Sequence, residues 1–411
     1  MESPTRRRSR SNSLHIALLC AFFCLLVSGC AANLKNPFGK SGLHSENQGA
    51  NGPTNTPQLK RNTTVKVALL LPLGSAKKRT ANIAKSLKQA GELALFDFDK
   101  PNIAIITRDT KGTPEGAKKA AEAAIKAGAS LIIGPLFATS VRAAAPITRQ
   151  ANIPMIAFSS DRSVAGDGVY LLSFLAGRDI PRIISYAVSK GKRKFAALIP
   201  KTAYGNIVEA SFKKVTRDLG AEAVAIERYP LDANAMLDPI KRIAELTKDE
   251  FNPIDAILIP AGPATLPSLS PLIPYFEIDT QKVQLIGTGQ WDYANIGREK
   301  PLFGGWFPAP EPGGWRDFTQ RYVKTYGKSP HRIASLSYDA VSLAVSLSSN
   351  ERNDRFTKSQ LTRPSGFAGI DGLFRLLPDG TSERGLAVLE VQKFGFKTLD
   401  NAPNAFNRAE F

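Results

Sequence analysis

The sequence predicts an α/β fold with two doubly wound parallel sheets, one in each of two lobes. Buried-strand patterns alternate with helical patterns from Val65 onwards, which is typical of parallel strands joined by helices. After a junction at Phe174–Pro181 the same alternation begins again. The chain has 411 residues, enough for two domains of ordinary size. Two such lobes leave a cleft between them, where small-molecule sites commonly lie.

An export signal is predicted at the N-terminus. Four of the first ten residues are arginine, and the apolar run that follows, Leu14–Val27, has 14 residues. This length is typical of a signal peptide, because a membrane-spanning helix needs about 20 residues. The run ends in Leu26-Val27-Ser28-Gly29-Cys30, which resembles the bacterial lipobox. We therefore expect a lipoprotein signal peptide over residues 1–29 and a membrane-attached acyl chain on Cys30, with a plain N-terminal anchor as the alternative.

Residues 30–64 are predicted to form a flexible tether. They are rich in Asn, Gly, Pro, Ser and Thr, and they have too little apolar surface to fold alone. All three cysteines, Cys20, Cys24 and Cys30, precede or begin this segment. The body that follows therefore has neither a disulfide nor thiol chemistry, and we expect it to rely on its hydrophobic cores.

In the first lobe the expected strands and helices follow from local patterns. The first helix places Ile83, Leu87, Ala90 and Ala94 on one face. The second begins at Thr113-Pro114-Glu115, because Pro is favoured at the first helical position. The expected strands are Val65–Leu71, Ile103–Thr107, Ser130–Ile133, Ile153–Phe158 and Val169–Ser173, and a third helix covers Ala138–Gln150.

The second lobe repeats the alternation, and a helix pair and a hairpin follow it. Expected helices are Pro181–Lys190, Tyr204–Leu219, Ala233–Lys248, a broken segment over Thr265–Phe276, Trp315–Tyr326 and Arg332–Ser348. Expected strands are Phe195–Pro200, Ala223–Arg228, Asp255–Pro260 and Val283–Gly287. The chain then ends in a predicted hairpin that pairs Gly372–Leu377 with Leu386–Phe394 through the turn Pro378-Asp379-Gly380.

Small hydroxyl residues follow two strands of the first lobe. Thr139 and Ser140 come after one strand, and Ser159 and Ser160 after the next. Ligands of open α/β sheets sit beyond the carboxyl ends of the strands, and hydroxyls beside free amides suit a carboxylate. The alternative for Ser159 and Ser160 is a helix cap.

The sequence argues against catalysis. The body has one histidine, His331, and no cysteine, so it offers neither a zinc cluster nor a second candidate for a Ser-His-Asp triad. It contains no G-x-S-x-G, G-x-G-x-x-G or P-loop motif. We therefore expect no enzyme, no metal and no cofactor. The net charge of +18 would suit nucleic acid, but predicted export excludes that partner and leaves anionic surfaces, anionic polymers or solubility.

An ordered set of short motifs resembles the type I periplasmic solute-binding proteins of the leucine/isoleucine/valine-binding kind. The motifs run from Val65 to about Phe396, and they are Pro72-Leu73-Gly74, Ile133-Gly134-Pro135-Leu136, Ala145-Pro146, Ile153-Pro154, Ser159-Ser160, Ala203-Tyr204-Gly205, Tyr338-Asp339-Ala340 and the Gly372 to Val388 hairpin. The resemblance implies two Rossmann-like lobes that are joined by three crossover strands and close on a ligand. The corresponding ranges are 65–182 with about 301–350 for lobe 1, and 183–300 with about 367–396 for lobe 2.

The resemblance also implies ligand contacts. Thr139, Ser140, Ser159, Ser160 and Asp161 would contact the ligand's carboxylate or backbone atoms, and Tyr204 would pack on the ligand from the second lobe.

Gln290 falls where amino-acid binders of this family place a Glu against the ligand's ammonium. An amide cannot neutralise that cation, so this position departs from the family pattern. The first loop departs as well, because Lys77, Lys78 and Arg79 would suit an anion or a partner surface. For Tyr204 the alternative is a core aromatic, for Trp291 and Trp306 it is packing, and for the three cations it is a solvated surface.

Two functions remain open from the sequence. The first is a lipid-anchored periplasmic receptor that captures an amino acid or a related small polar or anionic solute for an ABC-type permease. The second is a non-catalytic outer-membrane lipoprotein that resembles penicillin-binding protein activators and contacts a peptidoglycan synthase. Ala31, which follows the lipidation cysteine, favours the outer membrane over inner-membrane retention.

Overall fold

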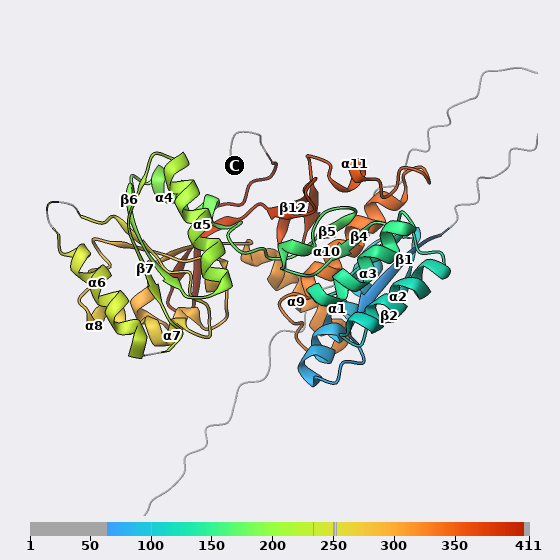
Figure 1. Ribbon diagram of the computed structural model, residues 1–411, viewed down its shortest axis with the longest axis horizontal. Coiled ribbons are helices and arrows are strands. Elements are labelled where there is room, and N and C mark those ends of the chain that lie inside the picture. The colour runs from blue at the N-terminus through green and yellow to red at the C-terminus, as the bar shows by residue number, and fades with distance from the viewer. Residues whose placement is uncertain (1–63, 100, 233, 250, 252, 407–411) are drawn as a thin grey trace, which may run out of the picture. The chain divides into compact units, whose positions relative to one another are not determined.

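The computed structural model describes residues 64–406 except 100, 233, 250 and 252, and Figure 1 labels its elements. The predicted signal peptide, the tether up to residue 63 and Cys30 lie outside the described residues. The described strands form three sheets, with the orders β2-β1-β3-β4-β5, β15-β14-β10-β9-β8-β6-β7 and β11-β12-β13. In this part of the chain, none of the helices combines the length and the apolar character that a membrane span requires.

The first sheet is wholly parallel and is covered on both faces. Val67, Leu69 and Leu71 of its interior strand β1 face one core cluster with α1 and α10, whereas Ala68 and Leu70 face another with α2 and α3. Alternation along the strand thus gives the sheet two buried faces. The strands are β1 (Val65–Leu71), β2 (Ile103–Asp109), β3 (Leu131–Ile133), β4 (Met155–Ala157) and β5 (Val169–Leu171), and the helices are α1 (Lys78–Phe96), α2 (Pro114–Lys126) and α3 (Ala138–Gln150).

The second sheet is parallel from β7 to β10, and β14 and β15 extend it antiparallel. Leu198 of β6 faces one core cluster and Ile199 the other, so this sheet is also covered on both faces. Its strands are β6 (Lys194–Pro200), β7 (Glu222–Tyr229), β8 (Ala256–Leu258), β9 (Gln284–Ile286), β10 (Trp306–Ala309), β14 (Ala387–Gln392) and β15 (Gly395–Asp400). Its helices are α4 (Ile180–Ser189), α5 (Ala203–Asp218), α6 (Leu237–Thr247), α7 (Leu266–Leu269) and α8 (Leu272–Tyr275). The predicted α/β fold with two doubly wound lobes is confirmed.

The remaining elements pack on the first lobe. Helix α10 (Ala334–Ser348) shares a core with α1, and α9 (Pro312–Tyr326) packs there through Phe318 and Tyr322. The third sheet consists of β11 (Phe367–Gly369), β12 (Gly372–Leu376) and β13 (Ser382–Arg384), and α11 (Lys358–Leu361) precedes it. Phe374 and Leu376 of β12 belong to the same core cluster as β1.

The predicted C-terminal hairpin is wrong in its second strand. The turn at Pro378-Asp379-Gly380 joins β12 to the short strand β13, whereas β14 pairs with β10 and β15 in the other sheet. Both lobes can bury an apolar strand, so local pattern alone does not decide which sheet receives it. Two parts of the expected lobe ranges differ from the structure for the same reason. Strand β10 was expected in lobe 1 but lies in the second sheet, and β11–β13 were expected in lobe 2 but pack with the first lobe. The chain therefore crosses between the lobes after β5, after β10 and after β13.

Candidate functional site

A cleft of about 440 Å³ lies where the three crossings meet. Its volume falls within the usual range for small-ligand sites. Residues of all three crossings line it together with residues of both lobes: Ser160, Ser173, Phe174, Leu175, Ala176, Arg178, Asp179, Tyr204, Ile207, Gly289, Gln290, Asp292, Pro308, Pro310, Arg332, Ser382, Glu383, Arg384 and Leu386. A larger hollow of about 1280 Å³ lies along α4 and α5, but each of its basic side chains already has a hydrogen-bond partner within the protein.

Asp179 brings an incompletely bonded carboxylate to this cleft. It precedes α4 at the end of the first crossing, and its Oδ2 accepts a hydrogen bond of 2.7 Å from the backbone N–H of Gly289. Its Oδ1 is buried and has no hydrogen-bond partner. Burial raises the pKa of Asp179, and the N–H groups of Gly289, Asp179 and Ile180 offset only part of that effect. A buried carboxylate oxygen without a partner is costly, so the site favours a ligand that supplies a donor or a cation.

Tyr204 at the start of α5 and Gln290 in the turn after β9 line the cleft near Asp179, which bonds Gly289 of that turn. The Tyr204 hydroxyl and the Thr288 hydroxyl are 2.8 Å apart, and the Thr288 hydroxyl also accepts from the N–H of Gln290 at 3.3 Å. Burial raises the pKa of Tyr204 well above its usual value, so this hydroxyl stays protonated. The turn is fixed by the fully buried Trp291, whose Nε1 donates to the carbonyl of Ile259 at 3.1 Å.

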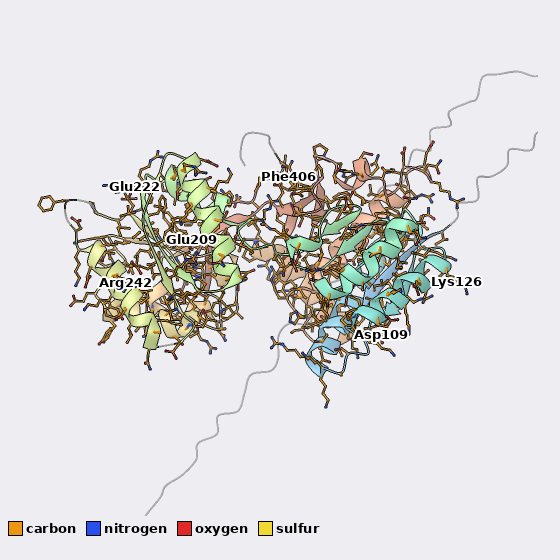
Figure 2. The ribbon with its side chains drawn as sticks, viewed as in Figure 1. Asp109, Lys126, Glu209, Glu222, Arg242 and Phe406 are labelled. Carbon is orange, nitrogen blue, oxygen red and sulfur yellow. The ribbon has the colours of Figure 1, made fainter. Side chains whose placement is uncertain are left out.

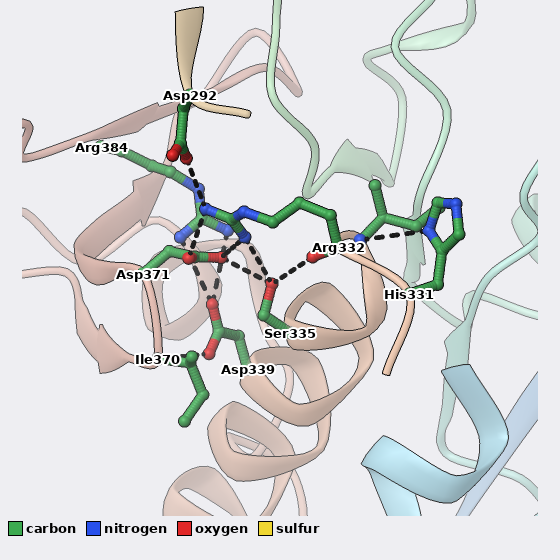
Figure 3. Close-up of polar contacts among 9 residues, drawn as sticks. Asp292, His331, Arg332, Ser335, Asp339, Ile370, Asp371 and Arg384 are labelled. Atoms are coloured by element: carbon green, nitrogen blue, oxygen red, sulfur yellow. Dashed lines mark hydrogen bonds and ion pairs between the residues drawn. The ribbon is translucent and has the colours of Figure 1, made fainter. Parts of the chain in front are cut away.

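A cluster of arginines and aspartates reaches the cleft through Asp292, Arg332 and Arg384, and Figure 3 shows its contacts. Arg332 lies 2.9 Å from the fully buried carboxylate of Asp371 and donates to Asp292 at 3.2 Å. Its guanidinium also lies 4.6 Å from the ring centre of Trp315 and 5.0 Å from that of Phe174, within cation–π range. Burial raises the pKa of Asp292, and the charge of Arg332 works in the opposite direction.

Arg384 is the second arginine of this cluster. Its Nη1 and Nη2 atoms lie 3.3 and 3.4 Å from Oδ2 of Asp339, which is fully buried. Burial raises the pKa of Asp339, while the charge of Arg384 acts to lower it. Phe174 lies against both guanidiniums, because its ring centre is 5.1 Å from Arg384 as well as 5.0 Å from Arg332. This exposed ring, in the first crossing, therefore contacts Arg384, which precedes the third crossing.

Three of the seven ligand contacts expected from the sequence line the cleft, namely Ser160, Tyr204 and Gln290. The other four lie elsewhere. Thr139 is exposed in the first turn of α3, and the buried Ser140 hydroxyl lies 3.5 Å from the carbonyl of Thr113. The buried Ser159 hydroxyl accepts from the N–H of Asp161 at 3.1 Å, and Asp161 pairs with Arg142 at 2.9 Å.

The alternatives weighed from the sequence can be placed as well. Trp291 is a core residue, and Trp306 packs edge-on against Tyr186. Lys77, Lys78 and Arg79 are exposed around the start of α1, and none of them lines the cleft. Charged side chains such as Lys126 on the first lobe, and Glu222 and Arg242 on the second, also lie at the surface (Figure 2).

Sequence reasoning missed the charged residues of the cleft. Asp179 follows Arg178 inside the predicted junction, and charges in a segment that joins two domains were a usable signal. Arg332 and Arg384 gave no such signal, because one begins a predicted helix and the other lies in what was expected to be a hairpin connection. Their role depends on Asp371 and Asp339, which are distant in the sequence.

Comparisons with known families and structures agree with the observed fold. A family model described as periplasmic binding protein matches residues 64–394. The Leu/Ile/Val-binding protein homolog 6 of Brucella melitensis is 27% identical over 169 residues, which are 40% of this chain and 42% of that protein. The matched segment thus spans less than half the length of this curated relative.

Two solved structures share the fold across nearly their whole length. An ABC transporter substrate-binding protein from Desulfitobacterium hafniense, in complex with Leu, has a TM-score of 0.59 and 19% identity, and the match covers 82% of this chain and 99% of that one. A solute-binding protein of an ABC transporter from Rhodopseudomonas palustris BisB5, in complex with 3,4-dihydroxybenzoic acid, has a TM-score of 0.55 and 19% identity, with coverage of 83% and 99%. At these identities the likeness concerns the fold alone.

Proposed function

Because the chain belongs to the periplasmic binding protein family, we propose that it is an exported receptor that captures an amino acid in the cleft and delivers it to an ABC-type transporter. The family is one of solute-binding proteins, not of enzymes. Support comes from the cleft at the three crossings, whose volume of about 440 Å³ admits a small solute. The similar proteins described above include a relative named for binding Leu/Ile/Val and a structure with bound leucine.

One observation supports an amino acid over an aromatic acid, which is the ligand of the other similar structure. The buried Oδ1 of Asp179 lacks a hydrogen-bond partner and belongs to a residue of the cleft. An ammonium group would both donate to this oxygen and neutralise the carboxylate, which a benzoate-like ligand cannot do. Asp179 thereby supplies the charge that the amide of Gln290 lacks. Tyr204 and Gln290 would pack beside the ammonium, and Ser160 would donate to the ligand's carboxylate.

The N-terminus supports an anchored form of this receptor. The signal-like segment and the lipobox-like sequence before Cys30 imply acylation of that cysteine and attachment to the periplasmic side of a membrane, with the outer membrane favoured by Ala31. The tether up to residue 64 would give the lobes room to reach a permease. Labelling with a radioactive fatty acid, compared between the wild type and Cys30→Ala, tests this part.

Calorimetric titration with the twenty amino acids and with 3,4-dihydroxybenzoate tests the ligand class. The mature chain is first unfolded and refolded to remove any bound solute. We expect at least one amino acid to bind, and Asp179→Asn to weaken that binding by about a hundredfold, because a close charge pair in a buried site is lost. Glu222→Gln is the matched control, since Glu222 is an exposed acid on the same lobe, and it should leave affinity unchanged (Figure 2).

Binding of the aromatic acid alone would overturn the assignment of Asp179. A well-folded protein that binds none of these solutes would overturn the receptor proposal. It would favour the alternative of a lipoprotein that contacts a peptidoglycan synthase, which a pull-down of the synthase then checks.

A further inference from the structure

Asp179 is not the only cleft residue with an unused polar atom. Oγ of Ser382 and Nε of Arg384 also have no hydrogen-bond partner, although both residues line the cleft. Ser382 is 2% exposed and Arg384 is 8% exposed, so bulk water does not readily satisfy these groups. Buried donors without a partner are rare in folded proteins and point to a missing ligand or water.

Strand β13 carries both groups on one face. Ser382 and Arg384 are two residues apart on one strand, so their side chains leave the same face. Nη1 and Nη2 of Arg384 each donate to Asp339, which leaves Nε as the guanidinium nitrogen without a partner. The guanidinium also lies within cation–π range of two rings, at 5.1 Å from the centre of Phe174 and 5.3 Å from that of Phe374. The side chain of Arg384 is therefore fixed before any ligand arrives, which lowers the entropic cost of binding.

The charges around β13 indicate a neutral binding partner. The positive charge of Arg384 is balanced by Asp339, and that of Arg332 by Asp371 and Asp292. A carboxylate placed here would add a negative charge beside three aspartates, and the buried like charges would oppose it. An uncharged oxygen can accept from both donors without disturbing this balance.

We propose that Ser382 and Arg384 bind an uncharged oxygen at the side-chain end of the ligand, and that the solute is an amino acid with a carboxamide side chain. The carboxamide oxygen accepts from Nε of Arg384 and from the hydroxyl of Ser382. This inference rests on the proposed receptor function, in which Asp179 binds the ammonium group. Asp179 then binds the ammonium group of the amino acid, and Ser382 and Arg384 bind the end of its side chain. Strand β13 therefore determines which amino acid the protein selects.

Titration with glutamine, glutamate and leucine tests the inference, because glutamine and glutamate differ only in the terminal group and leucine has no acceptor there. On the full mature chain we expect glutamine to bind at least about tenfold more tightly than either competitor, since a site with unpaired donors rejects a ligand that cannot satisfy them. Ser382→Ala should remove most of the preference over leucine.

Two further variants complete the experiment. Arg384→Lys keeps the charge that Asp339 requires but loses the Nε donor, so it should reduce the preference for glutamine without unfolding the protein, as circular dichroism verifies. Ser268→Ala is the matched control, because Ser268 is an exposed serine of α7, and it should change nothing.

Equal affinity for glutamine and leucine, or tighter binding of glutamate, would overturn the inference about β13 while the receptor function stands. If no amino acid binds to the wild type, and Asp179→Asn therefore changes no binding signal, both proposals fail together.

Discussion

The guanidinium of Arg332, at the start of α10 in the first lobe, donates a hydrogen bond of 3.2 Å to the carboxylate of Asp292 in the second lobe. The same guanidinium is anchored by Asp371, which is fully buried and 2.9 Å away. The two carboxylates differ in environment, because the side chain of Asp292 is 28% exposed and that of Asp371 is not exposed at all. One arginine thus serves a buried partner within its own lobe and a partly exposed partner across the cleft.

This difference predicts unequal effects of two substitutions. Arg332→Gln should lower the free energy of unfolding by about 3 kcal/mol, because it leaves Asp371 charged and buried without its cation. Asp292→Asn should cost at most about 1 kcal/mol, since a partly exposed pair contributes little. Urea unfolding followed by circular dichroism measures both. Similar losses from the two variants would show that the contact between the lobes matters more than the buried one.

The raised pKa of Asp179 predicts opposite pH dependences for stability and for binding. In the free protein, burial disfavours the ionised carboxylate, so its contribution to stability is fully present below its ordinary pKa of 3.8 and is lost as pH rises through the raised value. A ligand ammonium needs the ionised form, so affinity should rise over the same window. Calorimetric titrations between about pH 4 and about pH 7 measure this rise, given the usual range of carboxylate pKa values. Asp179→Asn should abolish it, and an unchanged profile in that variant would assign the titration to another group.

A glycine in the turn that carries Gln290 predicts a combined loss of stability and binding. A Cβ atom added at Gly287 would lie 2.1 Å from Cδ2 of Trp291, far inside contact distance. Because Trp291 is fully buried, it cannot move aside without opening the core, and Gly287→Ala should cost about 2–4 kcal/mol. Ligand affinity should fall as well, since Gln290 adjoins the displaced ring. Gly313→Ala is the control, because nothing lies within 4 Å of a Cβ at that position. Equal unfolding midpoints for the two variants would contradict the argument.

Much of the fold could be predicted because its signals are local. The apolar run Val65–Leu71 and the helix Ala138–Gln150 have the bounds expected from sequence. The second helix starts at Pro114, as predicted, and the structure shows Thr113 as its cap. The site was less accessible to prediction. Hydroxyls at strand ends led to Ser160, which lines the cleft, and equally to Ser140 and Ser159, which are buried and make contacts within the first lobe.

The sequence by itself determined where strands and helices form, that they make two α/β lobes, and which family pattern they follow. Hydrophobic periodicity and helix caps involve residues close together in the chain, so they can be recognised in a single sequence. Only the tertiary structure decided that β14 leaves β13 for the other sheet and that Asp179 meets Gly289, 110 residues away. The pKa of such a carboxylate, and whether both of its oxygens find hydrogen-bond partners, depend on which distant groups exclude water from it. That is a property of packing in three dimensions.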